Sequence, residues 1–496
     1  MPSSQKMPQC LNKGPYGKAD RMNEVNKEMV NDKMVNSKWF RHIGYGFGDM
    51  SSSMFWKVFS YYLPFFYSNI FGLSLKDAGI ILLVTRIWDA VSDPMMGIIA
   101  DRTQTRWGTY RPYLRFVAPL FSIAGILLFT TPDWGYTAKL IWAYVTYILM
   151  MTVYTGINVP YGAMLGVMTE DSQEKTVYSS FRMFFAYGGS FLALFLWEPL
   201  CNALGGYNTP QGWFWAMVVI ASACFVLFIC CFALTREELK TVSTVSIGSD
   251  FKALLSNKPW WILIGAALCF NLFCTVRGAT VAYYFADIIP AGAQLAIGRW
   301  SFLFYAGLFL AVGEVSNMIG VALCVPIAAR FGKKTTFIAI NIALCVLSVL
   351  FFFIPVSQTG FWLMLLAQIL ISMLTGVMSP LVWSMYADVS DYAEQEYKTA
   401  STGLIFSSSS MAQKFGGAIG GSAALWLLAA CGYISNPQTG EAFTQPDSAL
   451  LCLRCLMSFI PAAVSIIAVL VVSSYPLTTA KMAEIDAQLK IQRQND

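Results

Sequence analysis

The stretch Gly97-Ile-Ile-Ala-Asp101-Arg102 closes a long apolar segment and leads into a basic loop that reaches Tyr113. A similar stretch, Ala329-Arg330-Phe331-Gly332-Lys333-Lys334, closes another apolar segment in the second half of the chain. Long apolar segments that end in Arg and Lys are typical of membrane helices whose basic end faces the cytoplasm. The repeated ending therefore predicts a membrane protein built from an internal repeat.

The composition points to the same class of protein. The chain has 496 residues, of which 56% are hydrophobic and 12% are charged, and its mean hydropathy is +0.55. Soluble domains carry about 25% charged residues, so much of the expected charge is missing. A chain this apolar would not stay monomeric in water, which excludes a soluble enzyme, a disordered protein and a nucleic-acid-binding protein.

Twelve stretches are long and apolar enough to cross a bilayer, for which a helix needs about 20 residues. A polar tail over residues 1–43 precedes the first of them, so we expect no cleaved signal peptide. The predicted spans cover residues 44–71, 79–100, 113–131, 138–168, 177–200, 213–234, 259–289, 300–328, 335–355, 361–387, 402–431 and 449–474.

Lys and Arg are concentrated in the two tails and in the loops that follow the even-numbered spans. Positively charged loops stay on the cytoplasmic side, so we expect a multi-pass plasma-membrane protein with both termini in the cytoplasm, in the inner membrane if the source is bacterial. The predicted domains are a cytoplasmic tail over 1–43, a six-helix half over 44–234, a central cytoplasmic loop over 235–258, a second six-helix half over 259–474 and a cytoplasmic tail over 475–496.

A second feature repeats with the same period. Pro160 in the fourth span is followed by Glu170, and Pro380 in the tenth span is followed by Asp388 and Asp391. Equivalent features thus lie six spans apart, which predicts an all-α polytopic fold of twelve transmembrane helices in two six-helix halves. Two such halves enclose a binding site near the bilayer midplane and rock around it. Topology alone would explain the basic loops but not the repeated spacing from proline to acid.

Several charged residues lie well inside the predicted spans. A charge at the bilayer centre costs about 2.5–3.5 kcal/mol on insertion scales, so each of them is a candidate for function. We interpret Arg277 and Glu314 as a structural ion pair between the seventh and eighth spans. The candidates are Asp49, Lys57, Arg86, Asp89, Asp93, Arg182, Arg277, Glu314 and Lys414.

Asp89 and Asp93 form the clearest candidate site. They stand four residues apart on one helix face, and two carboxylates at that spacing repel unless a cation lies between them. Ser92 adds a third oxygen, and small hard cations such as Na⁺ prefer oxygen donors. Pro94 donates no backbone hydrogen bond and loosens the helix. In the alternative interpretation Arg86 pairs with Asp89 and the group only stabilises the bundle, which would leave Asp93 unpaired.

Polar residues in the first and fourth spans are candidates for binding a hydroxylated ligand. Thr155, Asn158 and Tyr161 stand three residues apart and share a helix face. Their hydroxyl, amide and phenol groups would form a polar wall, although a helix–helix contact held by polar side chains is the alternative. Asp49 follows the glycine-rich stretch 44–48 and is a candidate acceptor for ligand hydroxyls.

One cation lies in each half, Arg182 in the fifth span and Lys414 in the eleventh. Either could hold sugar hydroxyls or a carboxylate, and Ser410, one turn before Lys414, joins this candidate substrate group. The two cations could instead neutralise Asp49 or the aspartate pair. Both roles are compatible, because a charge partner that binding displaces is one way to couple two sites.

Other chemistry finds little support in the sequence. His42 is the single histidine, which excludes a proton relay built on histidine. Cys452 and Cys455 have the spacing of half a zinc site, but no second pair accompanies them. No nucleophile–base pair is recognisable, so we expect a protein that is not an enzyme and has no catalytic residues.

Six motifs resemble the glycoside–pentoside–hexuronide:cation symporter family of the major facilitator superfamily, and the resemblance covers residues 40–475. The motif in the second span is highly specific to that family. The motifs are Gly44-Tyr-Gly-Phe-Gly-Asp49, Arg86-Ile-Trp-Asp-Ala-Val-Ser-Asp-Pro94, Arg106-Trp-Gly-Thr-Tyr-Arg-Pro112, Asn158-Val-Pro-Tyr-Gly162, Ala387-Asp-Val-Ser-Asp-Tyr392 and Gln413-Lys-Phe-Gly-Gly417.

The resemblance implies uptake of a sugar, glycoside or hexuronide coupled to Na⁺, with Li⁺ or H⁺ as alternative ions and no cofactor. Asn158 and Gly162 stand where galactoside carriers have Asp and Trp, so the resemblance favours the pentoside and hexuronide branch. Expected partners are a small sugar, the ion and the lipid bilayer, without nucleic acid, and the protein is expected to be a monomer. The resemblance places the cation at Asp89, Ser92, Asp93 and Thr155 and the sugar at Asp49, Asn158, Arg182 and Lys414.

In the expected mechanism Na⁺ binds between Asp89 and Asp93 in the outward-open state, orders spans 2, 4 and 11 and raises the affinity for sugar, a coupling that is reciprocal. Basic residues at the cytoplasmic face would brace that state against acidic residues. These gating candidates are Arg102, Arg106, Arg111, Glu170, Asp388 and Asp391. Three alternatives stay open: coupling to H⁺, a sodium-coupled lysolipid carrier with an apolar cleft, and a transporter-like sensor that binds without translocating.

Overall fold

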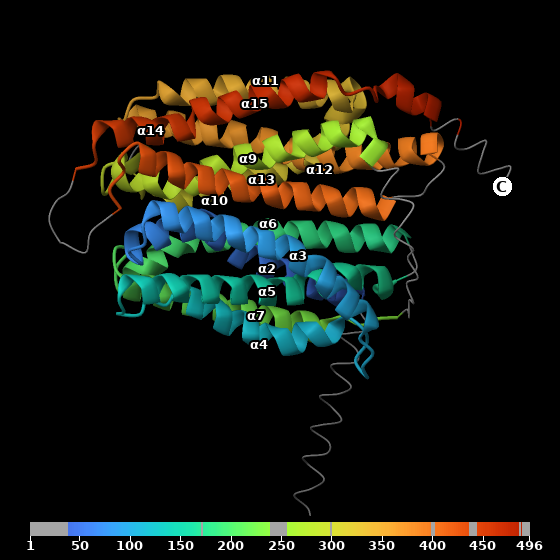
Figure 1. The fold of residues 1–496 in the computed structure, drawn as a ribbon, viewed down its shortest axis with the longest axis horizontal. Coiled ribbons are helices and arrows are strands. Elements are labelled where there is room, and N and C mark those ends of the chain that lie inside the picture. The colour runs from blue at the N-terminus through green and yellow to red at the C-terminus, as the bar shows by residue number, and fades with distance from the viewer. Residues whose placement is uncertain are drawn as a thin grey trace, which may run out of the picture.

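The computed structural model describes residues 38–169, 172–238, 255–297, 300–397, 402–435, 444–485 and 488. Long helices that run side by side form two bundles that face each other along their length (Figure 1). The first bundle consists of α2 (Lys38–Phe65), which continues into the π-helical turn η1 (Phe66–Ile70), α3 (Leu75–Arg102), α4 (Arg111–Leu128), α5 (Tyr136–Met168), α6 (Ser172–Ala203) and α7 (Pro210–Leu234).

The second bundle begins with α9 (Lys258–Asp287), which is followed by a two-stranded antiparallel hairpin. The hairpin consists of β1 (Gln294–Ile297) and β2 (Trp300–Leu303), and the remaining helices are α10 (Ala306–Phe331), α11 (Lys333–Phe352), α12 (Gln358–Tyr397), α13 (Thr402–Ala430), α14 (Asp447–Met457) and α15 (Phe459–Ser473). We call the end of the bundles that holds Lys38, Arg102 and Arg330 the basic end, and the opposite end the hairpin end.

Nine helical segments in the described part of the chain are long and apolar enough to cross a membrane by length and composition. Helices α2, α3 and α13 have 28, 28 and 29 residues but do not meet that criterion. These three helices carry charged residues of the candidate site, such as Asp89 and Lys414. The all-α polytopic fold is thus confirmed, whereas the predicted number of twelve spans is matched by helix length and not by hydropathy alone.

Local sequence explains where several helices begin and end. The hydroxyl of Ser74 accepts a hydrogen bond from the backbone N–H of Asp77 at the start of α3, and the side chain of Asn257 does the same for Trp260 in α9. Such caps satisfy N–H groups that have no partner in the first helical turn. Gly332 has a φ of +79°, which ends α10 inside the basic stretch that closes the eighth span.

The predicted span 300–328 is wrong at its beginning. Residues 300–303 form strand β2, in which Trp300 lies opposite Ile297, and α10 begins at Ala306. A short apolar run has no periodicity that separates a strand from a helix, so the composition concealed the hairpin.

The predicted span 449–474 is broken in two. Ser458, with φ −133° and ψ −82°, separates α14 from α15. Pro461 lacks the N–H group that the carbonyl of Met457 would accept in a continuous helix. The guanidinium of Arg277 on α9 donates a hydrogen bond to this carbonyl instead.

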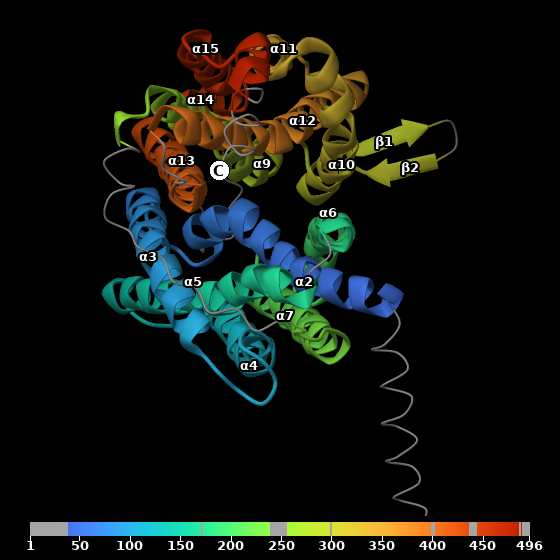
Figure 2. The same cartoon turned by 90° about the vertical axis from the view of Figure 1, so that its right-hand side faces the viewer.

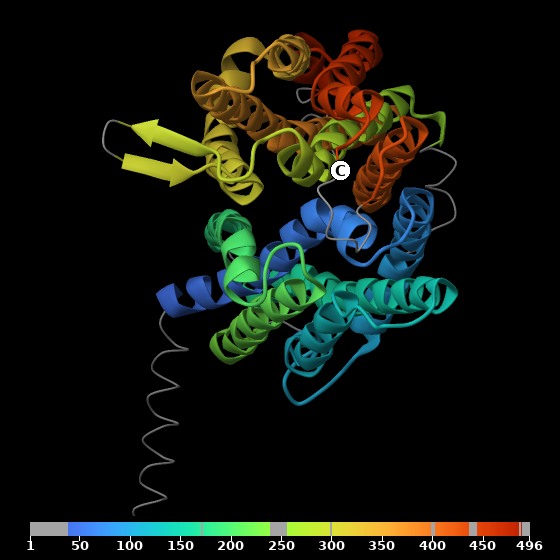
Figure 3. The ribbon, with the colours of Figure 1, turned by 90° about the vertical axis from the view of Figure 1, so that its left-hand side faces the viewer.

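The bundles are joined at the hairpin end. One buried apolar cluster there includes side chains of both bundles, such as Phe66, Trp213, Tyr283 and Phe309, whereas a second cluster lies within the second bundle. Helix α13 packs along α3 and α10 along α6, as the end-on views show (Figures 2 and 3).

Polar contacts cross between the bundles at the same end. Tyr283 donates to the carbonyl of Pro64 at 2.8 Å, and Ser422 donates to the carbonyl of Gly79 at 2.8 Å. Toward the basic end, the ion pairs that the structure describes, such as that of Lys333 with Asp388, join residues of one bundle.

Candidate functional site

The four predicted cation-site residues lie together between α3 and α5. Thr155 Oγ1 lies 2.9 Å from Asp93 Oδ1 and 3.2 Å from Asp89 Oδ1. Ser92 Oγ lies 3.5 Å from Thr155 Oγ1 and donates to the backbone carbonyl of Asp89 at 3.2 Å. A hydroxyl carries one proton, so Thr155 donates to one carboxylate at a time. The group gathers oxygen atoms from two charged and two uncharged side chains.

Lys414 on α13 connects the second bundle to this group. Its Nζ lies 3.2 Å from Asp89 Oδ2 and forms a hydrogen-bonded ion pair with Asp93 Oδ2. The side chain of Asp89 is 1% exposed, and its Oδ2 makes no hydrogen bond with any described residue. Arg86 Nη1 lies 3.9 Å from the same oxygen. The ammonium group of Lys414 therefore lies between the two carboxylates, where the sequence predicts a cation.

A cavity of about 390 Å³ lies beside this group, between the two bundles. Helices α2, α3, α5, α9 and α13 line it, and its volume is within the range of about 300–1,000 Å³ that is usual for small-molecule sites. Trp56 forms part of the wall, with the guanidinium of Arg86 4.4 Å from its ring centroid. Polar side chains of the lining include Lys57, Arg86, Asn271, Ser410, Gln413 and Lys414.

Asp49 and Arg182 form a separate group nearer the basic end. Arg182 Nε on α6 donates to Asp49 Oδ2 on α2 at 2.8 Å. The guanidinium of Arg182 lies 5.3 Å from the ring centroid of Tyr161. Tyr161 is fully buried, stacks on Tyr45 and donates its hydroxyl proton to the backbone carbonyl of Tyr45 at 2.6 Å. Tyr161 therefore packs against Arg182, and its hydroxyl proton is donated to Tyr45 and not to a ligand.

Asn158 on α5 lies three residues from Thr155 of the first group and three residues from Tyr161 of the second. Its Nδ2 lies 3.4 Å from the hydroxyl of Tyr154, and its Oδ1 is buried without a hydrogen bond to any described residue. The ring of Tyr154 packs 5.1 Å from that of Trp56 in the cavity wall. Of the predicted substrate residues, the cavity is lined by Ser410 and Lys414, while Asp49, Asn158, Tyr161 and Arg182 lie outside its lining.

The expected ion pair between Arg277 and Glu314 is wrong. Glu314 Oε1 accepts a hydrogen bond from Lys57 Nζ at 2.6 Å, which joins α10 to α2 across the bundles. Arg277 donates instead to the carbonyl of Met457 and to Gln368 Oε1, the latter at 3.1 Å. Spacing along one span identifies neighbours on the same helix, but it does not say which side of a helix meets which partner.

The family whose description reads MFS/sugar transport protein matches residues 44–479 of the chain. The chain belongs to this family. The matched residues extend from the first turns of α2 past the end of α15. The family pattern therefore covers both bundles and all four predicted cation-site residues.

Three relatives extend this similarity. The candidate glycoside/cation symporter YagG of Escherichia coli (strain K12) is 34% identical over 90% of this chain and 94% of its own length. The isoprimeverose transporter of Lactiplantibacillus pentosus is 32% identical over 80% of this chain and 81% of its own. The glucuronide carrier protein homolog of Escherichia coli (strain K12) is 29% identical over 92% of this chain and 97% of its own.

Solved structures show the same fold at low sequence identity. A bacterial homologue of the human drug peptide transporters PepT1 and PepT2 superposes with a TM-score of 0.67 at 12% identity, covering 90% of this chain and 100% of that chain. The arrangement of two facing helical bundles is therefore shared with other transporters.

The predicted gating residues that the structure describes lie at the basic end. The guanidinium of Arg106 lies 4.1 Å from the ring centroid of Trp107, and Arg111 Nη2 donates to the carbonyl of Phe232 at 2.8 Å. Asp388 Oδ1 accepts from Lys333 Nζ at 2.6 Å. Each of these contacts stays within one bundle. Arg102 is the last residue of α3, Asp391 lies in α12, and Glu170 lies outside the described residues.

Glu237 is a residue of the basic end that the sequence analysis missed. Its Oε1 accepts hydrogen bonds from the backbone N–H groups of Tyr110 and Arg111, each at 2.7 Å, and its Oε2 accepts one from Thr109 at 2.7 Å. A carboxylate at this position is stabilised by the N-terminus of α4. Burial and the hydrogen bond to Asp101 raise the pKa of Tyr110 to about 12, so its hydroxyl stays protonated as a donor at physiological pH.

Proposed function

We propose that this protein is a secondary active symporter that couples the influx of Na⁺ to the uptake of a sugar or glycoside by alternating access. The observation that carries this proposal is the contact of Lys414 with both Asp89 and Asp93. The carboxylates belong to the first bundle and the ammonium group to the second, so whatever replaces the ammonium group changes how the bundles interact.

The coupling follows from competition for the same oxygen atoms. Na⁺ and the ammonium group of Lys414 cannot occupy the place between the carboxylates together, so cation binding releases Lys414 toward the cavity that it lines. An ammonium group donates up to three hydrogen bonds, which sugar hydroxyls accept. The cation then raises the affinity for sugar, and sugar raises the affinity for the cation by the same factor.

H⁺ is the alternative coupling ion. The side chain of Asp93 is 30% exposed, and protonation of its carboxylate would also release Lys414. Li⁺, another small hard cation, would use the same oxygens. Varying Na⁺ at fixed pH separates these ions: uptake that follows Na⁺ supports the sodium site, and uptake that follows only the pH gradient supports H⁺.

The cavity lining supports a sugar over a lysolipid. Lys57, Asn271 and Gln413 bring charged and amide groups to the cavity, and an apolar chain beside them would leave buried polar groups without partners. The relatives named for isoprimeverose and glucuronide transport support the same substrate class. Asn158 and Gly162 stand where galactoside carriers of the family have Asp and Trp, so this resemblance favours another sugar.

The proposed setting is the plasma membrane, with a monomeric protein and both termini in the cytoplasm. The basic end is then cytoplasmic, since basic loops stay on that side. With this orientation, the contacts between the bundles at the hairpin end support a proposed conformation that opens toward the cytoplasm.

Uptake by the purified protein in proteoliposomes tests this function. Radiolabelled pentosides, glucosides and hexuronides are offered with an inward Na⁺ gradient and with equal Na⁺ on both sides. We expect accumulation of at least one of these ligands with the gradient and none above equilibrium without it. Sugar accumulation that ignores Na⁺ and Li⁺ would overturn the sodium assignment, and binding without uptake would favour the sensor.

A further inference from the structure

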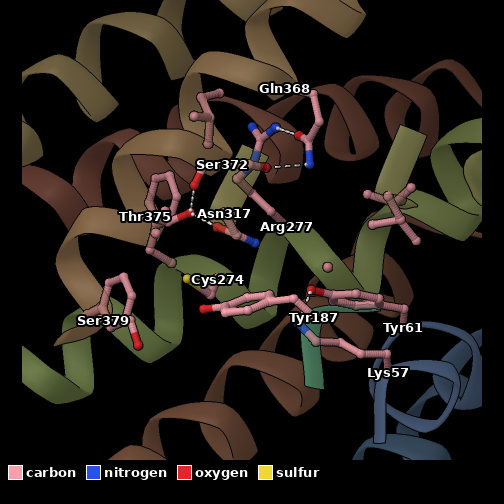
Figure 4. Close-up of a pocket in the computed structure, with 17 residues that line it drawn as sticks. Lys57, Tyr61, Tyr187, Cys274, Arg277, Asn317, Gln368, Ser372, Thr375 and Ser379 are labelled. Atoms are coloured by element: carbon pink, nitrogen blue, oxygen red, sulfur yellow. Dashed lines mark hydrogen bonds between the residues drawn. The ribbon is translucent and has the colours of Figure 1, made fainter. Parts of the chain in front are cut away.

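A smaller recess of about 200 Å³ adjoins the main cavity and is lined by α2, α6, α9, α10 and α12. The two spaces share Lys57, Tyr61 and Cys274 in their walls. Figure 4 shows Lys57 and Tyr61 at one end of the recess and Arg277 with Gln368 at the other. We call this space the Arg277 recess.

Within the part of the chain that the structure describes, no acid pairs with Arg277. The residue is 5% exposed, and its hydrogen-bond partners among the described residues, the carbonyl of Met457 and Gln368 Oε1, are uncharged. Among the described residues no Asp or Glu oxygen forms an ion pair with Arg277, whereas Lys57 pairs with Glu314 and Lys414 pairs with Asp89. Burying a charge without a counter-charge is costly, so this guanidinium favours an anion.

The second cation of the recess is already neutralised. Lys57 Nζ lies 2.6 Å from Glu314 Oε1, and the side chain of Glu314 is 2% exposed. The charges of this pair cancel, which leaves the positive charge of Arg277 as the excess. A ligand that spans both spaces passes Lys57 and meets the unbalanced charge at the far end.

The remaining lining supplies neutral polar groups. Thr375 Oγ1 lies 3.0 Å from Asn317 Oδ1 and 3.0 Å from the carbonyl oxygen of Ser372, and its one proton is donated to one of them at a time. Gln368 Nε2 donates to Ser372 Oγ at 3.2 Å. Because the oxygen of Asn317 faces Thr375, its amide N–H groups are the part left for a ligand in the recess that it lines. An amide donor beside a guanidinium suits an acceptor with more than one oxygen.

We propose that the Arg277 recess is a subsite for the carboxylate of an acidic glycoside, whose sugar ring lies in the main cavity beside Trp56 and Lys414. A guanidinium presents parallel N–H groups that match the two oxygens of a carboxylate. This inference rests on the proposed function and narrows its substrate class to glycosides that carry a carboxylate.

The test compares two ligands that differ only in this group. Methyl β-glucuronide has a carboxylate where methyl β-glucoside has a hydroxymethyl group, and binding of each to the purified full-length protein is measured by calorimetry at saturating Na⁺. We expect the glucuronide to bind about tenfold more tightly or better, since a charge-assisted contact with a buried partner is worth at least that factor.

Two variants locate the preference at Arg277. Gln368→Glu replaces the amide, whose oxygen lies 3.1 Å from Arg277 Nη2, with a carboxylate of nearly the same shape. This carboxylate neutralises the charge of Arg277. Arg277→Gln removes the charge itself. Both should weaken glucuronide binding about tenfold and leave the glucoside affinity within a factor of about two. Arg454→Gln, the same change at an exposed position of α14, is the matched control and should alter neither affinity.

Each other outcome contradicts the inference. Equal loss of both ligands in Gln368→Glu would show that Arg277 only anchors the break between α14 and α15. If the unchanged protein bound the glucoside more tightly than the glucuronide, the carboxylate subsite would be wrong. Sodium-driven uptake of that glucoside would still support the proposed function. If neither ligand bound, the inference would fail, and the uptake panel with pentosides would decide the proposed function separately.

Discussion

Asp93 is the more accessible carboxylate of the pair, with 30% of its side chain exposed against 1% for Asp89. In Asp93→Asn the site loses one negative charge, while Lys414 and Arg86 still face Asp89. We expect sodium-stimulated uptake to fall on the order of 100-fold, because a buried cation loses a charged partner. Uptake in proteoliposomes with and without Na⁺ measures this.

The matched control for that change is Asp133→Asn in the exposed loop before α5. This change removes one negative charge outside the pair formed by Asp89 and Asp93, and the stimulation of uptake by Na⁺ should stay unchanged. Sodium stimulation that survives intact in Asp93→Asn would remove Asp93 from the cation site.

Lys414 competes with the cation in this account. In Lys414→Met the carboxylates lose their ammonium partner, so we expect Na⁺ to bind about tenfold more tightly while the effect of Na⁺ on sugar affinity disappears. Sodium titrations by calorimetry, with and without sugar, measure both quantities. The exposed Lys481→Met is the control. An unchanged sodium affinity would show that Lys414 and Na⁺ use different places.

The sequence predicted which side chains of one helix act together better than it predicted partners on different helices. The four-residue spacing of Asp89 and Asp93 placed them on one face, and Thr155 lies against both. The sequence analysis paired Glu314 with Arg277, whereas its partner in the structure is Lys57. Which of the two cations meets Glu314 depends on how the bundles pack. No spacing within one helix contains that information.

At the scale of elements, the contact between α6 and α10 holds the hairpin end together. Glu198 Oε1 accepts hydrogen bonds from the backbone N–H of Gly307 at 2.9 Å and from the hydroxyl of Tyr62 at 2.9 Å. The carboxylate thus links the first turn of α10 to the other bundle. We expect Glu198→Ala to shift the population toward states open at the hairpin end by roughly tenfold.

Distances between spin labels at the exposed positions Leu204 and Ser301 report this opening. Glu198→Gln is the matched control, because an amide oxygen still accepts both hydrogen bonds, and it should keep the distance distribution of the unchanged protein. If Glu198→Ala and Glu198→Gln gave the same distribution, the hydrogen bonds would not hold this end closed.

Local sequence signals mark some helix boundaries, although the predicted spans 79–100 and 300–328 did not use them. Ser74 caps α3, and Gly332 ends α10 with its positive φ. The hairpin at residues 294–303 was missed, because its apolar side chains continue the composition of the following span. Hydropathy alone also misses α2, α3 and α13, the helices that carry Asp49, Asp89 and Lys414 of the candidate sites.

At the scale of the whole molecule, the structure joins the bundles at the hairpin end and places the cavity between them. Cys274 lines both the main cavity and the Arg277 recess, so it is a native probe of access. We expect a membrane-impermeant maleimide to label Cys274 from the basic end, and saturating Na⁺ with sugar to slow the labelling, since ligand covers the residue.

Labelling in inside-out and right-side-out vesicles, followed by mass spectrometry, distinguishes the two directions. Cys274→Ala identifies the labelled peptide among the twelve cysteines of the chain. Faster labelling from the hairpin end would mean that the cavity opens the other way.

The two-bundle architecture was predictable from the repeated features six spans apart, and the family match supports it. Which end is closed was not predictable, because both conformations of such a protein bury similar apolar surfaces. Contacts such as that between Tyr283 and Pro64 decide it here, and they arise only when the bundles are placed against each other.

If cation and sugar move together through the carboxylate pair, a gradient of sugar drives the movement of the ion. Proteoliposomes with equal Na⁺ on both sides receive an inward gradient of a transported glycoside, and the flux of radioactive sodium is measured. The account predicts inward, uphill sodium flux that disappears in Asp93→Asn. Downhill sugar flux without sodium movement at fixed pH would contradict it.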